Sequence, residues 1–183
     1  MKMGIKNVIE KRRSIRKYQD KEIPDSLIDE LVEAARLAPS AYNAQPLKFV
    51  ILKSKDTKEK LKKNKIFEQD FVYDAPIIFI CCGDPGVYPK ERLEPIFSNP
   101  SEIAGEVGAV RDVSIAAQNL VLRATDLGLG TCYVGLIARE KAREILDIPK
   151  NYVLPFVITV GYPAEKPEPT PRKDKDDLIL KNL

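Results

Sequence analysis

The sequence predicts a protein of mixed α and β structure, because amphipathic helical patterns alternate with short apolar runs of strand length. The strongest helical patterns cover residues 24–39 and 101–127. The strongest strand covers residues 75–82, where the continuous apolar run APIIFICC is typical of a strand buried on both faces. With 183 residues, 44% hydrophobic and 31% charged, the chain is expected to form a single globular domain over residues 1–183.

Start and stop signals divide the chain into further elements. Pro24-Asp25-Ser26 is a helix start signal, and Gly128 follows the end of the longest helix. Lysines crowd the segment 57–65, where we interpret them as a solvated helix face. Helices are expected at residues 3–11, 24–39, 57–65, 101–127 and 139–146, and strands at residues 48–53, 75–82, 131–136 and 153–160.

Composition excludes several mechanisms. The absence of histidine rules out Ser-His-Asp and Cys-His catalysis and the histidine-dependent zinc sites, and no metal site is expected. Cys81, Cys82 and Cys132 lie in apolar strands without C-x-x-C spacing, so they are expected to be buried thiols. General acid-base work would fall to carboxylates, tyrosine, lysine, water or a cofactor. No catalytic side chain is assigned, and a chain so poor in catalytic side chains is a candidate for chemistry done by a bound cofactor.

Charge and hydropathy restrict the partners. The 30 basic and 27 acidic side chains give a net charge of only +3, which is a weak footprint for a nucleic-acid binder. No apolar run approaches the length of a membrane span, and the N-terminus leads into charged sequence. We therefore expect a cytoplasmic protein with neither a nucleic-acid nor a membrane partner.

Two polar segments are candidate binding sites. Arg12-Arg13-Ser14-Ile15-Arg16 places three guanidinium groups and a hydroxyl within five residues, which suits a phosphate, although solvated charges at a helix end are the alternative. The loop at residues 38–46 carries Ser40, Asn43 and Gln45 between prolines, and it is either a surface turn or a reader of a polar ligand edge.

Two further segments are irregular. Residues 83–100 hold four prolines and two glycines and form an excursion or lid, whose Tyr88, Arg92 and Phe97 could line an opening over a ligand ring. Residues 161–183 are too rich in proline and charge to pack a core of their own. This arm either frays or lies along another subunit, and its apolar residues 178–180 favour the second.

The motifs of a Rossmann dinucleotide site and of a P-loop are missing, so the remaining parts suit a mononucleotide. The series RRSIRKY, APSAYNAQP, DAP, QNL, LGLGTCYVG, GYP and PRK resembles the FMN-dependent nitroreductase family over essentially the whole chain. The resemblance implies an α+β fold with a mixed central sheet flanked by helices. It also implies an intertwined homodimer with FMN at the subunit interface and C-terminal extensions that cross to the partner.

The resemblance also implies site residues. Arg12, Arg13, Ser14 and Arg16 match the FMN phosphate and ribityl contacts, joined by Arg172 and Lys173 in the tail. The loop that the other subunit lays against the flavin matches Pro39, Ser40, Ala41 and Asn43. Gln69 matches a contact to the pyrimidine edge, and Gln118 lies on the helix that borders the interface. The segment that passes flavin N5 matches Tyr133, Val134 and Gly135. Larger family members carry an acidic residue where this chain has Val134.

The implied activity is hydride transfer from NADH or NADPH through FMN to a nitroaromatic or quinone by a ping-pong mechanism. Ene reduction, reductive dehalogenation and flavin reduction on the same scaffold remain alternatives. A different class is a non-enzymatic anion- or RNA-binding domain that uses the basic segments 12–17 and 58–65. The lack of interleaved aromatic side chains and the balancing acids disfavour it.

Overall fold

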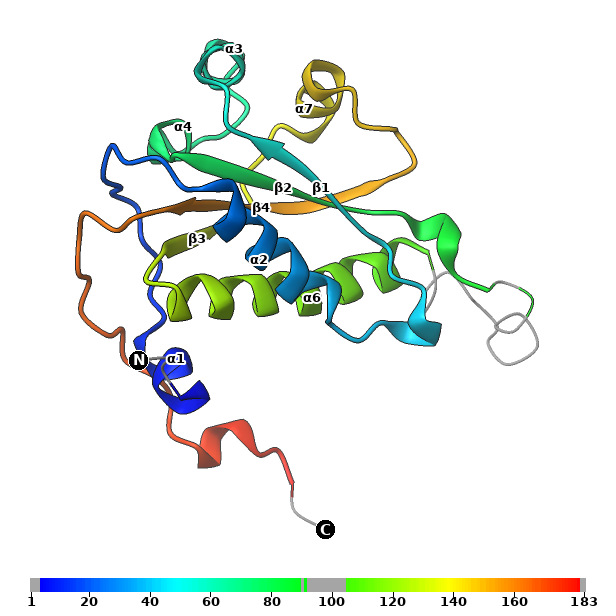
Figure 1. Cartoon of the computed structure of the whole chain (residues 1–183). Helices are drawn as coiled ribbons and strands as arrows, with labels where there is room; N and C mark the ends of the chain where they lie inside the picture. The colour runs from blue at the N-terminus through cyan, green and yellow to red at the C-terminus, as the bar shows by residue number, and fades with distance from the viewer. Residues whose placement is uncertain (1–3, 90, 92–104, 182–183) are drawn as a thin grey trace.

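The computed structural model describes residues 4–89, 91 and 105–181. Within these residues, four strands form one sheet in the order β1-β2-β4-β3, and helices cover both of its faces (Figure 1). The elements in chain order are α1 (Ile5–Lys11), α2 (Asp25–Arg36), η1 (Ala41–Asn43), β1 (Leu47–Leu52), α3 (Lys55–Lys63), α4 (Phe71–Asp74), β2 (Ile77–Gly83), η2 (Pro85–Val87), α6 (Glu106–Asp126), β3 (Gly130–Val134), α7 (Arg139–Leu146), β4 (Val153–Gly161) and η4 (Asp176–Leu178).

The α+β class is confirmed, and the strand pairing is more uniform than expected. All three neighbouring strand pairs of the described sheet are antiparallel, whereas the resemblance implied a mixed sheet. Among the residues that the structure describes, parallel pairing is limited to an isolated bridge between Ser14 and Thr131. None of the described helices has the length and hydropathy that a membrane span requires.

Strand β2 is buried on both faces, as its continuous apolar run predicts. Ile77, Phe79 and Cys81 face a core shared with α2 and α6. Their neighbours Ile78 and Ile80 face a second core, built with α3, α4 and α7. Because side chains alternate along a strand, one segment of seven residues joins two separate cores.

Helix α6 packs against both the sheet and α2. Its buried face includes Val113, Ala117 and Leu120, as the helical period predicts. Close packing against β2 requires Gly83, since a Cβ there would lie 2.9 Å from the Val113 side chain. The predicted start of this helix at Ser101 lies outside the described residues.

Two details differ from the expectation. Lys58 is buried rather than solvated, because its ammonium group donates hydrogen bonds to the carbonyls of Ala75 at 2.8 Å and Pro76 at 3.2 Å. The short helix α4, just before β2, has no period long enough to be seen in the sequence. The cysteines are confirmed as buried free thiols.

The buried thiols predict a loss of stability in alkali. Burial raises the pKa of the Cys82 thiol from an ordinary 9.0 to about 11. Above pH 9 the unfolded thiol ionises while the folded thiol stays neutral, so the folded state binds more protons and stability falls as the pH rises. The loss for one thiol approaches about 1.4 kcal/mol per pH unit.

Chemical denaturation at several pH values between 9 and 11 checks this. We expect Cys82→Ala to reduce the slope of the unfolding free energy against pH, whatever its effect at pH 7. An unchanged slope would mean that Cys82 ionises equally easily in the folded and unfolded chains.

Candidate functional site

The arginine-rich segment is held between two parts of the sheet. On one side the Ile15 amide donates to the Thr131 carbonyl at the start of β3 (2.9 Å). On the other side the Gln19 amide donates to the Tyr162 carbonyl, and the Ala164 amide donates to the Lys17 carbonyl, each at 2.9 Å. The backbone beneath the arginines is therefore fixed by the ends of β3 and β4.

Two glycines allow this close approach. A Cβ on Gly130 would lie 2.7 Å from Ile15, and one on Gly161 would lie 2.5 Å from the Tyr18 ring. The Tyr18 hydroxyl lies 2.6 Å from both the Ile15 carbonyl and the Thr159 hydroxyl. Burial raises the pKa of Tyr18, so this hydroxyl stays neutral and keeps the segment in place.

The predicted arginines differ in what they contact. Arg13 turns back and donates to the carbonyls of Glu10 (2.7 Å) and Arg12 (2.8 Å), so it caps the end of α1. Neither Arg12 nor Arg16 takes part in an ion pair among the described residues. Two unpaired guanidinium groups are thus available for an anion.

The thiol of Cys132 on β3 lies close enough to Arg12, Ser14 and Arg16 to interact with them electrostatically. The charges of Arg16 and Arg12 and a hydrogen bond from Ser14 each act to lower the pKa of Cys132. Burial outweighs them, and the pKa is raised. Arg12, Ser14 and Arg16 therefore all lie near enough to Cys132 to influence the pKa of its thiol.

At the far end of β3 the chain becomes accessible. The exposed Tyr133 side chain donates from its hydroxyl to Gln118 Oε1 at 3.4 Å, and its ring packs edge-on against Phe156 with centroids 5.0 Å apart. A Cβ on Gly135 would meet nothing within 4 Å. From Thr131 to Gly135 the backbone advances roughly 13 Å, so the cluster and the open glycine suit the two ends of an elongated ligand.

The segment after β3 is held by partners that sequence reasoning missed. Arg139 donates to the carbonyls of Gly135 (3.2 Å), Leu154 (2.8 Å) and Pro155 (3.0 Å). An antiparallel bridge joins Phe67 to Ile137, which follows β3, and the predicted Gln69 is exposed shortly after Phe67. Both contacts join residues distant in sequence, so no local pattern indicates them.

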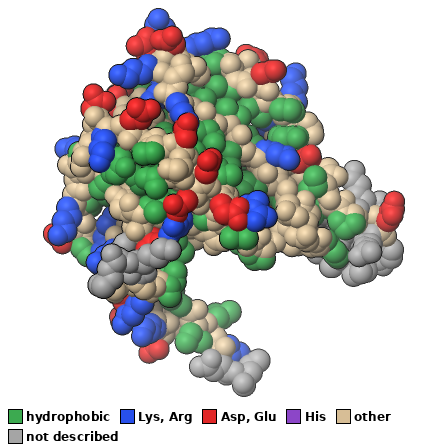
Figure 2. Space-filling view, viewed as in Figure 1, with side chains coloured by type: hydrophobic (Ala, Val, Ile, Leu, Met, Phe, Trp, Pro, Cys, Tyr) green, Lys and Arg blue, Asp and Glu red, His purple; other side chains and the backbone are tan. Residues whose placement is uncertain are grey.

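The remaining predicted residues lie elsewhere in the chain. Pro39, Ser40, Ala41 and Asn43 form the loop near the start of α6, at the end of that helix away from α1 (Figure 1). Arg172 and Lys173 are exposed on an arm that leaves the body of the molecule (Figure 2). One chain therefore brings together only part of the predicted site.

Tyr88 does not line an opening. It is 4% exposed, and its hydroxyl donates to Asp112 at 3.0 Å beneath the loop. The other two residues expected over the ligand, Arg92 and Phe97, lie outside the described residues.

Comparisons with known proteins identify the family. The model of the nitroreductase family matches residues 9–162, and the chain belongs to this family. It is 36% identical over 184 residues to a Methanothermobacter thermautotrophicus protein provisionally named NADH dehydrogenase/NAD(P)H nitroreductase, which covers 98% of this chain and 87% of the relative.

Two further relatives carry more specific names. The FMN reductase (NAD(P)H) of Bacillus subtilis is 32% identical over 168 residues, which are 87% of this chain and 66% of that protein. The solved structure of the NADPH:FMN oxidoreductase of Vibrio harveyi, complexed with NAD⁺, matches with a TM-score of 0.81 at 26% identity. That match covers 98% of this chain and 77% of the other.

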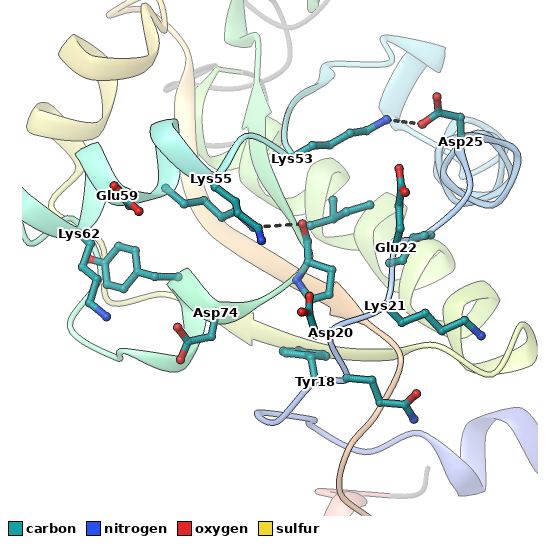
Figure 3. A pocket seen from close by; sticks show the side chains of 16 residues that line it. Tyr18, Asp20, Lys21, Glu22, Asp25, Lys53, Lys55, Glu59, Lys62 and Asp74 are labelled. Atoms are coloured by element: carbon teal, nitrogen blue, oxygen red, sulfur yellow. Dashed lines mark hydrogen bonds and ion pairs between the residues drawn. The ribbon is translucent and has the colours of Figure 1, made fainter.

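A separate cleft of about 820 Å³ lies between α3, α4 and the segment before α2 (Figure 3). Lysines and acids line it in equal number, and Lys53 pairs with Asp25. The balance of charge gives no preference for an anion. The lysines of α3 also lie across the sheet from the arginine segment (Figure 1), so the two do not form the continuous basic surface that RNA binding requires.

Lys58 in this cleft provides a test of the fold. In Lys58→Met the carbonyls of Ala75 and Pro76 lose their donor, and we expect the unfolding free energy to fall by about 1–3 kcal/mol. Lys60→Met, on the exposed face of the same helix, should change it by less than about 0.5 kcal/mol. Equal changes in urea denaturation of the two variants would show that the Lys58 bonds contribute nothing.

Proposed function

We propose that the chain is an FMN-dependent NAD(P)H oxidoreductase that reduces nitroaromatics, quinones or related acceptors. The observation that carries the proposal is the arrangement along β3, where unpaired arginines lie at one end and the open Gly135 at the other. Membership of the nitroreductase family and the names of the relatives support the choice of FMN and NAD(P)H.

The residues present fit this cofactor. Arg12 and Arg16 would bind the phosphate with Ser14 between them, and residues 133–135 would border the ring. Gly135 leaves the space that a side chain would fill. When bound, FMN supplies the hydride-transfer chemistry, so the protein needs no catalytic side chain, in agreement with a sequence that has no histidine.

The proposed reaction is NAD(P)H + H⁺ + quinone → NAD(P)⁺ + hydroquinone, with a nitro group as an alternative acceptor. FMN bound here would accept the hydride of NAD(P)H and pass it to the acceptor. The sequence would be ping-pong, because NAD(P)⁺ would have to leave before the acceptor could occupy the same open face. The protein would hold FMN and leave one face of the flavin open. None of the residues proposed to bind FMN would select a single acceptor.

We also propose a homodimer, because one chain does not complete the site. The partner's loop would supply the equivalents of Ser40, Ala41 and Asn43. Apolar side chains available for the interface are exposed along α1 and α6, namely Ile5, Ile9, Val107, Val110 and Ile115. These side chains are exposed in the single chain, so a second subunit could bury them.

The arm would cross to the partner in this dimer. Strand β1 is an open edge of the described sheet, and a cavity of about 640 Å³ lies beside it. The exposed Leu178, Ile179 and Leu180 of a second chain have the apolar character to cover this region. Such a crossing would also bring Arg172 and Lys173 toward the partner's site.

The arginines provide a direct test of cofactor binding. Removing both guanidinium groups in Arg12→Ala/Arg16→Ala should raise the Kd for FMN at least about 100-fold, because each charge-assisted bond contributes about 1.5–3 kcal/mol. The protein should keep its wild-type sedimentation coefficient and circular dichroism. Lys11→Ala/Lys17→Ala removes the same charge from adjacent exposed positions and should change Kd less than about threefold. Stoichiometric FMN retained by the arginine variant would refute the site.

Spectroscopy and kinetics test the reaction. The purified protein should show flavin absorption that NADH or NADPH bleaches anaerobically and that a quinone or nitroaromatic restores. Double-reciprocal plots at several acceptor concentrations should be parallel. Intersecting lines would refute the ping-pong sequence. Parallel assays with enones, halogenated aromatics and free flavin would separate the other reactions that this scaffold supports, and a colourless protein that takes up no FMN would refute the proposed function.

A further inference from the structure

Asp112 is a buried carboxylate that joins three segments of the chain. Its side chain is 2% exposed, although it lies on the long helix α6. Asp112 Oδ2 accepts hydrogen bonds from the Ala41 amide (2.9 Å) and the Tyr88 hydroxyl (3.0 Å), and Oδ1 accepts from Arg111 Nε (2.9 Å). A carboxylate is buried only where such partners replace water, so these three bonds depend on one another.

The loop bound by Asp112 has an unfavourable backbone. Tyr42, Asn43 and Gln45 have φ values of 55°, 54° and 50°, in the left-handed region that residues with a side chain rarely adopt. Inside the loop, the Gln45 amide donates to the Ser40 hydroxyl at 2.9 Å. Three such residues within four positions persist only where the surrounding structure holds them, and Asp112 supplies a bond from outside the loop.

Tyr88 belongs to the same unit. Its ring packs with Ala41, Ala44 and Ala109 beneath the loop, and its hydroxyl shares Oδ2 of Asp112 with the Ala41 amide. Both donors bond to the same oxygen, although the Ala41 amide precedes β1 and the Tyr88 hydroxyl follows β2. Loss of that acceptor would release both the loop and the segment that follows β2.

We propose that Asp112, with Tyr88, is a positioning residue for the flavin site of the neighbouring subunit. It touches neither cofactor nor substrate, and it holds the Ser40–Asn43 backbone in the conformation in which the loop meets the partner's cofactor. This inference rests on the proposed function. In this role the Asp112 carboxylate makes the loop rigid before FMN binds, so FMN binding does not have to order the loop.

The test compares two aspartates of the same helix. Asp112→Asn keeps the size of the side chain but replaces one acceptor oxygen by an NH₂ group that faces existing donors. Asp126→Asn is the matched control, because Asp126 pairs with Arg123 at the other end of α6, away from the loop. Both variants lose one charge from a paired aspartate.

We expect Asp112→Asn to raise the Kd for FMN at least tenfold and to change the visible circular dichroism of bound flavin, both measured well below the unfolding temperature. At saturating FMN, kcat should fall at least threefold. Asp126→Asn should leave these quantities within twofold of wild type, even if its melting temperature falls. A purely structural role for Asp112 predicts a lower melting temperature with unchanged Kd and dichroism, and that result would overturn the inference.

Tyr88→Phe keeps the test decisive if Asp112→Asn does not fold. It removes one donor, leaves the carboxylate paired, and should raise the FMN Kd at least threefold. A Kd equal to that of wild type in folded Tyr88→Phe would overturn the inference. Wild-type protein that binds no FMN would instead refute the proposed function, so the two failures are distinguishable.

Discussion

The burial of β2 on both faces is the constraint on which the rest of the structure depends. Side chains that alternate between two cores require helices on both sides of the sheet, and α2 with α6 on one side and α3, α4 and α7 on the other supply them. Within the sheet, β4 and then β3 follow β2, with antiparallel pairing throughout. The candidate site lies at one edge of this sheet, because β3 is one of its two outer strands and the arginine segment bonds to its Thr131 carbonyl.

Most of the fold could be predicted from the sequence, because the helices and strands that line its cores carry apolar residues in regular helical or strand patterns. The helix at residues 139–146 coincides with the prediction, and the four strands of the described sheet agree with it to within two residues at every boundary. The failures are non-local. Lys58 is one of several lysines in α3, and the local sequence does not distinguish it from the exposed ones. Its ammonium group nevertheless donates to the carbonyls of Ala75 and Pro76, just before β2. Similarly, the bridge from Phe67 to Ile137 exists only once the second core has assembled.

The candidate site was predictable in its chemistry but not in its layout. Three arginines and a serine within five residues indicate an anion site, yet only the structure separates Arg13, which caps α1, from Arg12 and Arg16, which stay unpaired. Asp112 did leave a signal in the sequence, since it is a charged residue on the buried side of α6 next to Val113. A charge at such a position indicates a specific partner, but the partners, Ala41 and Tyr88, could not be named before the loop was folded.

The contact between Tyr18 and Gly161 has a consequence for how this chain could diverge. No side chain fits at residue 161 while the tyrosine ring lies over it, and the tyrosine hydroxyl is bonded at both sides. A Cβ at residue 161 would also lie 2.7 Å from Pro76, so a change of Tyr18 alone would not make room for a side chain there. Descendants of this protein should therefore keep glycine at residue 161 wherever an aromatic ring at residue 18 or the proline at residue 76 is kept.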